Sequence, residues 1–385
     1  MLRPQLLTST RRLVPALRQK ASIAIEGHQA QVVSSTTESA SSTQRVIHNL
    51  LAAAAGVVTV SGFAAVIECT SEVPKYDPNG QRFSQDTFRG RFARMVLACD
   101  PRLLLYTDNY VHQCQYMLSN ARLYDDRALW EAKRIFEAAC PDGENIIPRP
   151  FRMSGYVPYN GPVSVAMISS QSTMPLLFWS WVNQSQNALV NYYNRNASSE
   201  MTNETLAKSY AAAVGSALLV AFGLATAIQR RFSPQRAKQL LQWVAFPSAI
   251  GASSLNCYIV RSPELETGIP LLDAQGNDVL PGTTSMEAAR RGVYATTASR
   301  AMLQAPVYFL PPMIMALGRK FIPTKMVVPM TTYLLLTCFG IGLPATVAIF
   351  PVMSRLRADQ VEERFQHLRD AQGKPYETFY YNKGL

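Results

Sequence analysis

Five long apolar segments limit what this chain can fold into more than any other feature of its sequence. Each is nearly free of charge and long enough to cross a hydrocarbon core about 30 Å thick at about 1.5 Å per residue of helix. A large soluble helical protein is the alternative, but five such segments rarely recur in one soluble chain. The sequence therefore predicts an all-α membrane protein with about five transmembrane helices. The expected spans are residues 156–178, 210–228, 243–260, 293–317 and 326–352.

The charge content agrees with a membrane protein. Charged residues make up 16% of the 385 residues, against about 25% in an ordinary soluble protein. The net charge of +11 is compatible with binding to nucleic acid, binding to anionic lipid, or an import signal. Because the apolar segments require a bilayer, we expect membrane lipid as a partner and no nucleic acid.

The N-terminal region has the pattern of a targeting signal followed by an extra hydrophobic helix. The first 25 residues contain five Lys or Arg and no acid, which is typical of a mitochondrial presequence (a transit peptide); a disordered basic tail is the alternative. We therefore expect residues 1–45 to be presequence-like and disordered. Residues 46–70 contain the apolar run Leu50 to Ile67, which can barely span a bilayer. A sorting segment and a helix packed on protein are equally compatible with this run.

A soluble region and a polar tail flank the expected membrane domain. Residues 71–155 are mostly polar, and Asp125 and Asp126 precede a helical pattern of apolar residues, so we expect a small soluble α-rich region there. The membrane domain is expected over residues 156–352. Residues 353–385 then form a C-terminal tail.

The links between the expected spans indicate an orientation. The link between the second and third spans carries four Lys or Arg and no acid, and the link between the fourth and fifth carries three and no acid. Positive loops remain on the side from which insertion begins, which in a mitochondrion is the matrix. With five spans, the soluble N-terminal region is expected in the matrix and the C-terminus in the intermembrane space.

The sequence contains no catalytic or metal-binding constellation. It has no P-loop, no dinucleotide-binding glycine pattern after a strand, and no nucleophile elbow. Its six cysteines include no Cys-x-x-Cys pair and its four histidines no His-x-x-x-His pair, so neither a zinc site nor a redox motif is expected. We therefore predict a protein that is not an enzyme and needs no metal or cofactor.

A stripe of amide side chains follows the first expected span. The residues recur at i, i+4, i+8 and i+11, which places them on one face of a helix. Such a face can bind a zwitterionic ligand without adding charge, but an interfacial helix whose amides face water is equally compatible with the pattern. The stripe consists of Asn183, Asn187, Asn191 and Asn194, with Gln184 beside it.

Two further polar residues lie within expected spans. Arg300 lies in the fourth span and is followed by three prolines; a cation there is costly unless it is paired or hydrated, and prolines are tolerated where the backbone lines a cavity. An Arg can hold a substrate carboxylate through forked hydrogen bonds, or its side chain can extend to the interface. Asn256, in the third span, needs a polar partner, and interhelical packing is the alternative to ligand binding.

Motifs spread over most of the chain resemble one known family. The best stretch runs from Phe178 to Arg195 with the sequence FWSWVNQSQNALVNYYNR. Supporting motifs are Thr87-Phe88-x-Gly90-Arg91, Asp100-Pro101-Arg102, Leu129-Trp130-x-Ala132-Lys133, Arg152-Met153-Ser154, Asn256-Cys257, Ser299-Arg300, Pro311-Pro312 and the end Tyr381-Asn382-Lys383-Gly384-Leu385. From about Phe83 to Leu385 the chain resembles the sideroflexins, proteins of the mitochondrial inner membrane. The resemblance implies five spans and transport of serine and other small neutral amino acids into the matrix, which supports one-carbon metabolism.

Two features depart from the family pattern. The family's His-Pro-Asp-Thr-Gly-Glu signature is reduced here to Cys140-Pro141-Asp142-Gly143-Glu144, and residues 1 to about 80 extend beyond the usual family length. We expect the signature loop, formed by Pro141, Asp142, Gly143 and Glu144, to act in gating. A family member recruited to a large complex would tolerate an altered signature and could dock through an added helix.

These observations predict a mitochondrial inner-membrane transporter of serine or another small neutral amino acid. The alternative is a non-transporting sideroflexin-like subunit or assembly partner of a large respiratory complex, with other inner-membrane subunits as partners. The expected substrate contacts are Asn183, Gln184, Asn187, Asn191, Asn256 and Arg300.

Overall fold

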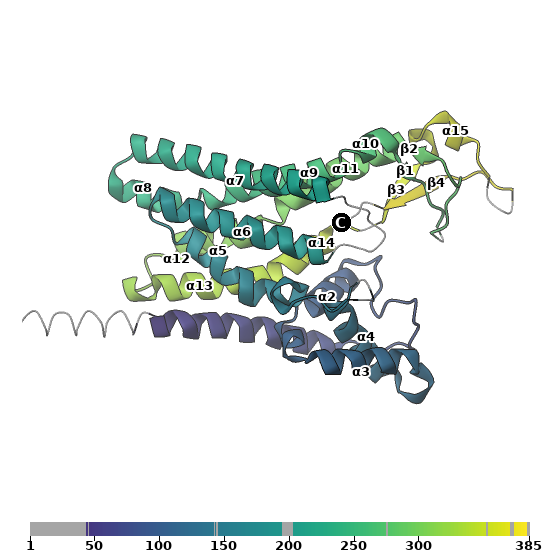
Figure 1. The fold of residues 1–385 in the computed structure, drawn as a ribbon, viewed down its shortest axis with the longest axis horizontal. Coiled ribbons are helices and arrows are strands. Elements are labelled where there is room, and N and C mark those ends of the chain that lie inside the picture. Colours follow the sequence, from purple (N-terminus) through teal and green to yellow (C-terminus); the bar gives the residue numbers. More distant parts are fainter. Residues whose placement is uncertain are drawn as a thin grey trace, which may run out of the picture. The chain divides into compact units, whose positions relative to one another are not determined.

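The chain divides into two compact units, Met1–Ala52 and Ala53–Leu385, and all the labelled helices and strands lie in the second (Figure 1). The expected presequence lies outside the described residues. The computed structural model describes residues 44, 46–141, 143, 145–194, 203–274, 276–351, 353–369 and 373–382.

The second unit is built mainly from helices. The α-helices are α2 (Phe88–Ala98), α3 (Asp108–Ser119), α4 (Asp126–Ala139), α5 (Gly161–Ile168), α6 (Thr173–Tyr193), α7 (Asn203–Arg231), α8 (Pro234–Leu241), α9 (Ala245–Arg261), α10 (Glu264–Thr267), α11 (Met286–Met302), α12 (Leu310–Gly318), α13 (Val327–Thr337), α14 (Leu343–Ile349) and α15 (Glu363–Gln366). The π-helical segments are η5 (Tyr156–Asn160), η6 (Ala305–Phe309) and η8 (Cys338–Gly342). The 3-10 turns are η1 (Pro101–Leu105), η2 (Ala121–Leu123), η3 (Arg149–Phe151), η4 (Met153–Gly155), η7 (Thr324–Met326) and η9 (Ala358–Gln360). Two antiparallel pairs complete it, β1 (Ile269–Pro270) with β2 (Thr284–Ser285) and β3 (Met353–Arg357) with β4 (Thr378–Asn382).

Five helices among the described residues are long and apolar enough to cross a membrane, which confirms the predicted fold class. The first of them is the extra N-terminal segment, called the extension helix from here on. The expected span over residues 156–178 is not among the five. They are Val46–Thr70, Tyr210–Arg231, Pro234–Arg261, Met286–Gly318 and Thr324–Ile349.

The expected span over residues 156–178 is a helical hairpin instead of one helix, which corrects the prediction. α5 ends at Ile168, and α6 begins at Thr173 after a serine-rich link. The link includes Ser170, whose Oγ donates to the carbonyl of Ala166 at 2.8 Å. Such back-bonding competes with the backbone ladder and weakens a helix, so the chain turns at this short polar link although the segments on both sides are apolar.

α6 returns to the level at which the hairpin began. Near its end, Asn194 Nδ2 donates to the carbonyl of Phe151 at 2.6 Å, and the rings of Tyr193 and Phe151 stack with centroids 5.0 Å apart. About two turns earlier, Gln186 Nε2 donates to the carbonyl of Pro150 at 2.8 Å. The hairpin therefore begins and ends at the same end of the helices.

The soluble region and the C-terminal tail also lie at one common end, contrary to the prediction that they face opposite sides. Arg91 Nε in α2 donates to the carbonyl of Ala348 in α14 at 2.9 Å, and α14 leads directly to β3. The segment between α9 and α11 joins the tail there through a bridge between Leu272 and Tyr380. The two basic links, after α7 and after α12, lie at the opposite end (Figure 1). The prediction failed because the hairpin replaces the first expected span by two passes, α5 and α6, so the chain passes an even number of times between the soluble region and the tail.

Small residues hold α7 and α9 together. Ser248 Oγ on α9 donates to the carbonyl of Ala217 on α7 at 2.7 Å, which requires close approach of the two backbones. In lipid, helices associate largely through such close packing, because the hydrophobic effect does not drive apolar helices together there. The buried small residues of this contact are Ala213, Ala217, Ala221 and Ala225 on α7 and Ala245, Ser248, Ala249 and Ala252 on α9.

The extension helix packs on α13 and η8 through two glycines. Val60 of this helix is 1% exposed and faces Gly340, where an added Cβ would lie 2.3 Å from Val60 Cγ2. Gly56 faces Leu336 of α13, and a Cβ at Gly56 would lie 2.8 Å from Leu336 Cβ. The absence of two side chains therefore allows the extension helix to lie this close.

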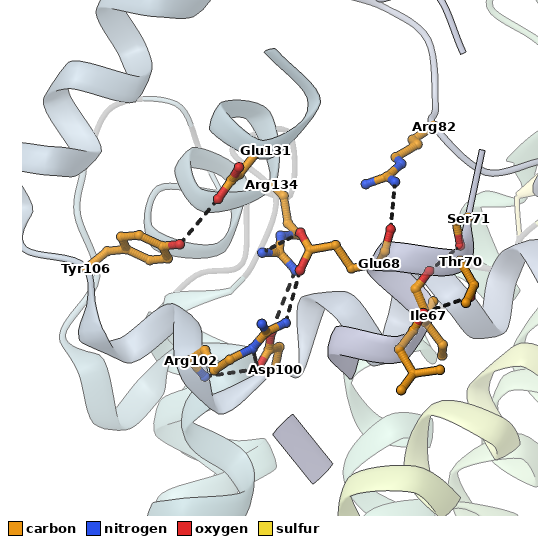
Figure 2. Close-up of polar contacts among 11 residues, drawn as sticks. Ile67, Glu68, Thr70, Ser71, Arg82, Asp100, Arg102, Tyr106, Glu131 and Arg134 are labelled. Atoms are coloured by element: carbon orange, nitrogen blue, oxygen red, sulfur yellow. Dashed lines mark hydrogen bonds and ion pairs between the residues drawn. The ribbon is translucent and has the colours of Figure 1, made fainter. Parts of the chain in front are cut away.

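A charged cluster fixes the end of the extension helix to the soluble region (Figure 2). Glu68 accepts from Nη2 of Arg102 and is paired with Nη2 of Arg134, both at 3.0 Å. Asp100, which is 0% exposed, pairs with Arg102 Nη2 at 2.7 Å, and this hydrogen-bonded contact raises the pKa of Arg102. Because Asp100 is buried among these cations, loss of either arginine would leave an uncompensated charge.

The C-terminal tail caps α11. Ser285 precedes this helix, and its Oγ accepts from the N–H of Ala288 at 3.1 Å and donates to Glu362 Oε2 at 2.7 Å. Glu362 Oε1 accepts from the N–H groups of Met286 and Glu287 at 2.6 and 3.1 Å. A carboxylate at a helix N-terminus satisfies free N–H groups and interacts favourably with the helix dipole. Burial raises the pKa of Glu362, but these hydrogen bonds outweigh it and leave the pKa below its usual value.

Replacing Glu362 with Gln should destabilise the protein in a pH-dependent manner. A carboxylate whose pKa is lower in the folded state contributes stability that is present above its unfolded pKa of about 4.3 and is lost as the pH falls through the folded pKa. We expect Glu362→Gln to cost about 1 kcal/mol at pH 7, since hydrogen bonds to a charge are replaced by neutral ones. The test compares thermal unfolding of both proteins in detergent at pH 7 and below pH 4. A difference that stays constant across this range would contradict the assigned role of the charge.

Candidate functional site

Three π-helical segments, η5, η6 and η8, meet among the helices of the second unit. A π-helical turn is rare and often marks a functional position. Proline accounts for the irregularity, because it has no N–H and interrupts the i to i−4 ladder. Pro158 lies within η5 and Pro306 within η6, while Pro344 is the second residue after η8.

A cavity of about 90 Å³ lies where these segments face α6, α9 and α11. This volume accommodates several water molecules or one small ligand. Its lining is mixed, and none of the lining residues is Asp or Glu. They are Tyr156, Asn160, Gln184, Asn187, Ala249, Ser253, Asn256, Arg300, Leu303, Gln304, Val307, Tyr308, Phe339 and Leu343.

One wall of the cavity is a hydrogen-bonded network centred on Asn183. This side chain is 0% exposed, and its Nδ2 donates to Tyr308 OH at 2.8 Å and to Asn160 Oδ1 at 3.2 Å. Asn187 Nδ2 in turn donates to Asn183 Oδ1 at 3.1 Å. The Oδ1 of Asn187 accepts from Tyr156 OH and from Asn160 Nδ2, both at 3.4 Å. Since a network with its members paired holds one arrangement, this wall is preorganised.

A second part of the wall, beside this network, carries polar groups that have no partner among the described residues. The side chains of Gln184, Ser253, Asn256 and Arg300 line the cavity, and within the described part of the chain they make no hydrogen bond with another residue. No carboxylate of that part lies within ion-pair distance of Arg300. Gln304 Nε2 donates to the backbone carbonyl of Arg300 at 3.2 Å. An unpaired cation in a helix that crosses a membrane is costly, so a ligand carboxylate is the natural partner for this wall.

The structure brings four of the predicted contact residues to the cavity: Gln184, Asn187, Asn256 and Arg300. Asn183 lies behind the wall, where it holds its neighbours instead of facing the cavity. The interior position of Asn183 also excludes the interpretation that the whole stripe faces water. The side chain of Asn191 lies outside the described residues.

The two described residues of the altered signature loop, Pro141 and Gly143, are not among the residues that line the cavity. Pro141 and Gly143 follow α4 in a turn in which the Gly143 N–H donates to the carbonyl of Cys140 at 3.1 Å, and Gly143 has a φ of 79°, which favours glycine. Asp142 and Glu144 lie outside the described residues. The expected role of this loop in gating stays a prediction.

Sequence reasoning missed three residues of the network: Tyr156, Asn160 and Tyr308. The first two belong to the segment that was expected to be a plain span, and Tyr308 was hidden in the apolar run after Pro306. Their only sequence signal was position, since each lies within two residues of a proline or glycine in a predicted membrane segment.

Comparison with known proteins gives one consistent result. The family model described as Sideroflexins matches residues 77–385. Human Sideroflexin-5 is 33% identical over 329 residues, covering 82% of this chain and 94% of the human protein. The chain belongs to the sideroflexin family. Caenorhabditis elegans Sideroflexin-5 is 36% identical over 326 residues, 81% of this sideroflexin and 96% of its own length. The Dictyostelium discoideum Sideroflexin is 32% identical over 330 residues, which cover 82% of this chain and 99% of the Dictyostelium protein. No solved structure matches.

Family membership supports a mitochondrial membrane protein of transporter type. The part of the chain that matches the family model, residues 77–385, includes every residue of the cavity lining. The extension helix of this sideroflexin precedes the matched region, so its packing on η8 is an addition to the family's part of the chain.

Proposed function

We propose that this sideroflexin transports small neutral amino acids, with serine as the representative substrate, across the mitochondrial inner membrane. The observation that carries the proposal is the unpaired Arg300 in a small cavity whose lining contains no carboxylate. A zwitterion supplies one carboxylate to Arg300 and adds no net charge to the site.

Each part of such a substrate has a chemically suitable group in the cavity. Arg300 binds the carboxylate through charge-assisted hydrogen bonds. Amide and hydroxyl oxygens of Gln184, Ser253 and Asn256 accept hydrogen bonds from the ammonium group or exchange them with a side-chain hydroxyl. The preorganised network behind Asn187 and Tyr308 keeps these positions fixed. A second carboxylate, as in glutamate, would find no further cation among the lining residues.

The orientation that goes with this proposal follows from the basic links. Positive loops favour the side from which insertion begins, so the end with the links after α7 and α12 would face the matrix. The soluble region and the tail, at the other end, would then both face the intermembrane space.

A second candidate function is a non-transporting subunit of a large inner-membrane complex. The extension helix, which precedes the matched part of the chain, favours it. A stable, stoichiometric set of partners that co-migrates with the chain on native gels would support this candidate.

Purified protein in liposomes should take up radiolabelled serine with saturable kinetics. Unlabelled alanine or cysteine should compete for uptake, because they keep the zwitterionic group and fit a cavity of about 90 Å³. Glutamate should not compete, because its second carboxylate is unpaired and costly to desolvate. Folded, correctly inserted protein that shows no uptake would contradict the transporter proposal and favour the subunit.

A further inference from the structure

A second, larger cavity lies outside the transport site, as a groove between α11 and the strand pair β3 and β4. Its volume is about 520 Å³. Two of its residues are arginines on the second turn of α11, and the tail contributes two hydroxyl groups. The residues that matter for its chemistry are Glu287, Arg290, Arg291, Tyr294, Ser354 and Tyr381.

The charges of the groove are arranged around one carboxylate. Glu287 Oε2 contacts Arg290 Nη2 and Glu287 Oε1 contacts Arg291 Nε, both at 2.7 Å. Arg291 Nη1 also donates to Gln360 Oε1 at 2.9 Å. Two guanidinium groups against one carboxylate leave one positive charge. Because a guanidinium has five N–H donors in a fixed fork, Glu287 holds both groups in place without using all of their donors.

Tyr381 adds an unpaired hydroxyl to the groove. The residue is 4% exposed, and its OH makes no hydrogen bond to any residue in the described ranges. Ser354, which lies directly opposite Tyr381 in the antiparallel pair of β3 and β4, likewise has no side-chain partner there. A buried hydroxyl without a partner is costly, so Tyr381 is suited to donate to an anion in the groove, and the half-buried Ser354 can donate beside it.

The exposed face of α11 shows what surrounds the groove. Every fourth residue of this helix is exposed and, apart from the arginine, apolar or aromatic: Met286, Arg290, Tyr294, Ala298 and Met302. In a helix that crosses a membrane such a stripe faces acyl chains. Tyrosine is favoured at the level of the lipid headgroups, and Arg290 lies one turn beyond Tyr294. The groove therefore opens at headgroup depth, next to a lipid-facing stripe.

We infer that the groove binds the headgroup phosphate of an anionic phospholipid. Arg290 and Arg291 hold the phosphate oxygens in forked geometry, as guanidinium groups do with phosphate, and Tyr381 and Ser354 donate to the same group. The acyl chains lie along Tyr294 and Met302. Zwitterionic lipids bind less well because their own cation competes with the arginines.

The test measures lipid binding by native mass spectrometry and by the thermal shift of the purified full-length protein. Phosphatidylglycerol, phosphatidylcholine and inorganic phosphate are added in separate arms. We expect phosphatidylglycerol to bind and stabilise, and the double variant Arg290→Gln/Arg291→Gln to weaken its binding about tenfold or more. Tyr381→Phe, which keeps the ring and so the packing, should weaken it severalfold.

A matched double variant controls for charge. Arg355→Gln/Arg357→Gln removes two exposed arginines from the neighbouring strand β3 and should leave binding unchanged. Equal losses in both double variants would show a diffuse electrostatic effect and overturn the site. Binding of phosphatidylglycerol by Arg290→Gln/Arg291→Gln and by Tyr381→Phe at the wild-type level would overturn it as well. Saturation by inorganic phosphate at the same concentration, without lipid selectivity, would assign the groove to a free anion instead.

Discussion

Arg300→Gln is expected to abolish serine uptake while the protein stays folded. The substitution removes the one cation of the cavity lining and keeps a hydrogen-bonding side chain. Loss of forked, charge-assisted hydrogen bonds to a carboxylate costs about 3 kcal/mol, which is roughly a hundredfold in affinity. The measurement is the initial rate of uptake over a range of serine concentrations.

Stability separates binding from a structural role for Arg300. The described part of the structure gives its side chain no ion pair, so the variant leaves no partner charge unpaired, and thermal unfolding in detergent should be unchanged or slightly improved. Arg319→Gln, at the exposed end of α12, is the matched control and should keep normal uptake. Normal uptake by Arg300→Gln would sink the assignment of this residue to the substrate.

Gly340→Ala should destabilise the protein and reduce uptake together. The new Cβ would lie 2.3 Å from Val60 Cγ2 and 2.7 Å from Val60 Cγ1, so the extension helix or η8 must shift. Overpacking of this kind costs about 1–3 kcal/mol. The neighbouring Phe339 lines the cavity and contacts the ring of Tyr156 edge-on with centroids 5.4 Å apart. A shift of η8 therefore reaches the cavity wall.

A double-mutant cycle tests that pair directly. Adding Val60→Ala to Gly340→Ala creates room for the new methyl group and should restore most of the lost thermal stability, which residues in contact allow and distant residues do not. Gly223→Ala on α7, where no atom lies within 4 Å of the added Cβ, should be neutral or stabilising because Ala favours helix. A cost at Gly340 that Val60→Ala leaves unchanged would contradict the proposed contact.

Hydropathy predicted the long helices well. It failed where a short turn hardly lowers the mean hydropathy of a segment. The later spans lie near their expected residues because each is predominantly apolar over a length that can cross a membrane. Residues 156–178 have the same average character, but short serines at the link let the chain reverse. The polar half of α6 was excluded from any span, although its amides find partners such as Asn160 inside the protein. One missed reversal was enough to misplace the tail.

The residues of the candidate site could be predicted where a polar side chain interrupts an apolar sequence. They could not be predicted where the residue type is ordinary for its segment. Arg300 and Asn256 are conspicuous in apolar segments, and the amide stripe has helical spacing. Tyr308 does not differ from an ordinary interfacial tyrosine in sequence, and only the π-helical turn after Pro306 places it against Asn183. The backbone irregularities that build the cavity arise from tertiary packing, which no local pattern encodes.

The chain passes an even number of times between the soluble region and the tail, which makes the two ends of the helices unequal. We call the end with the soluble region and the tail the front, and the end with the two basic links the back. In the described part of the second unit, the front carries all the folded polar structure: the soluble helices, the small strand pairs and the tail that caps α11. In the same part of the chain the back carries short links, of which those after α7 and after α12 are rich in Lys and Arg. Among the described residues of this unit, a partner that recognises shape therefore finds most of the available relief at the front, while the two basic links of the back offer positive charge.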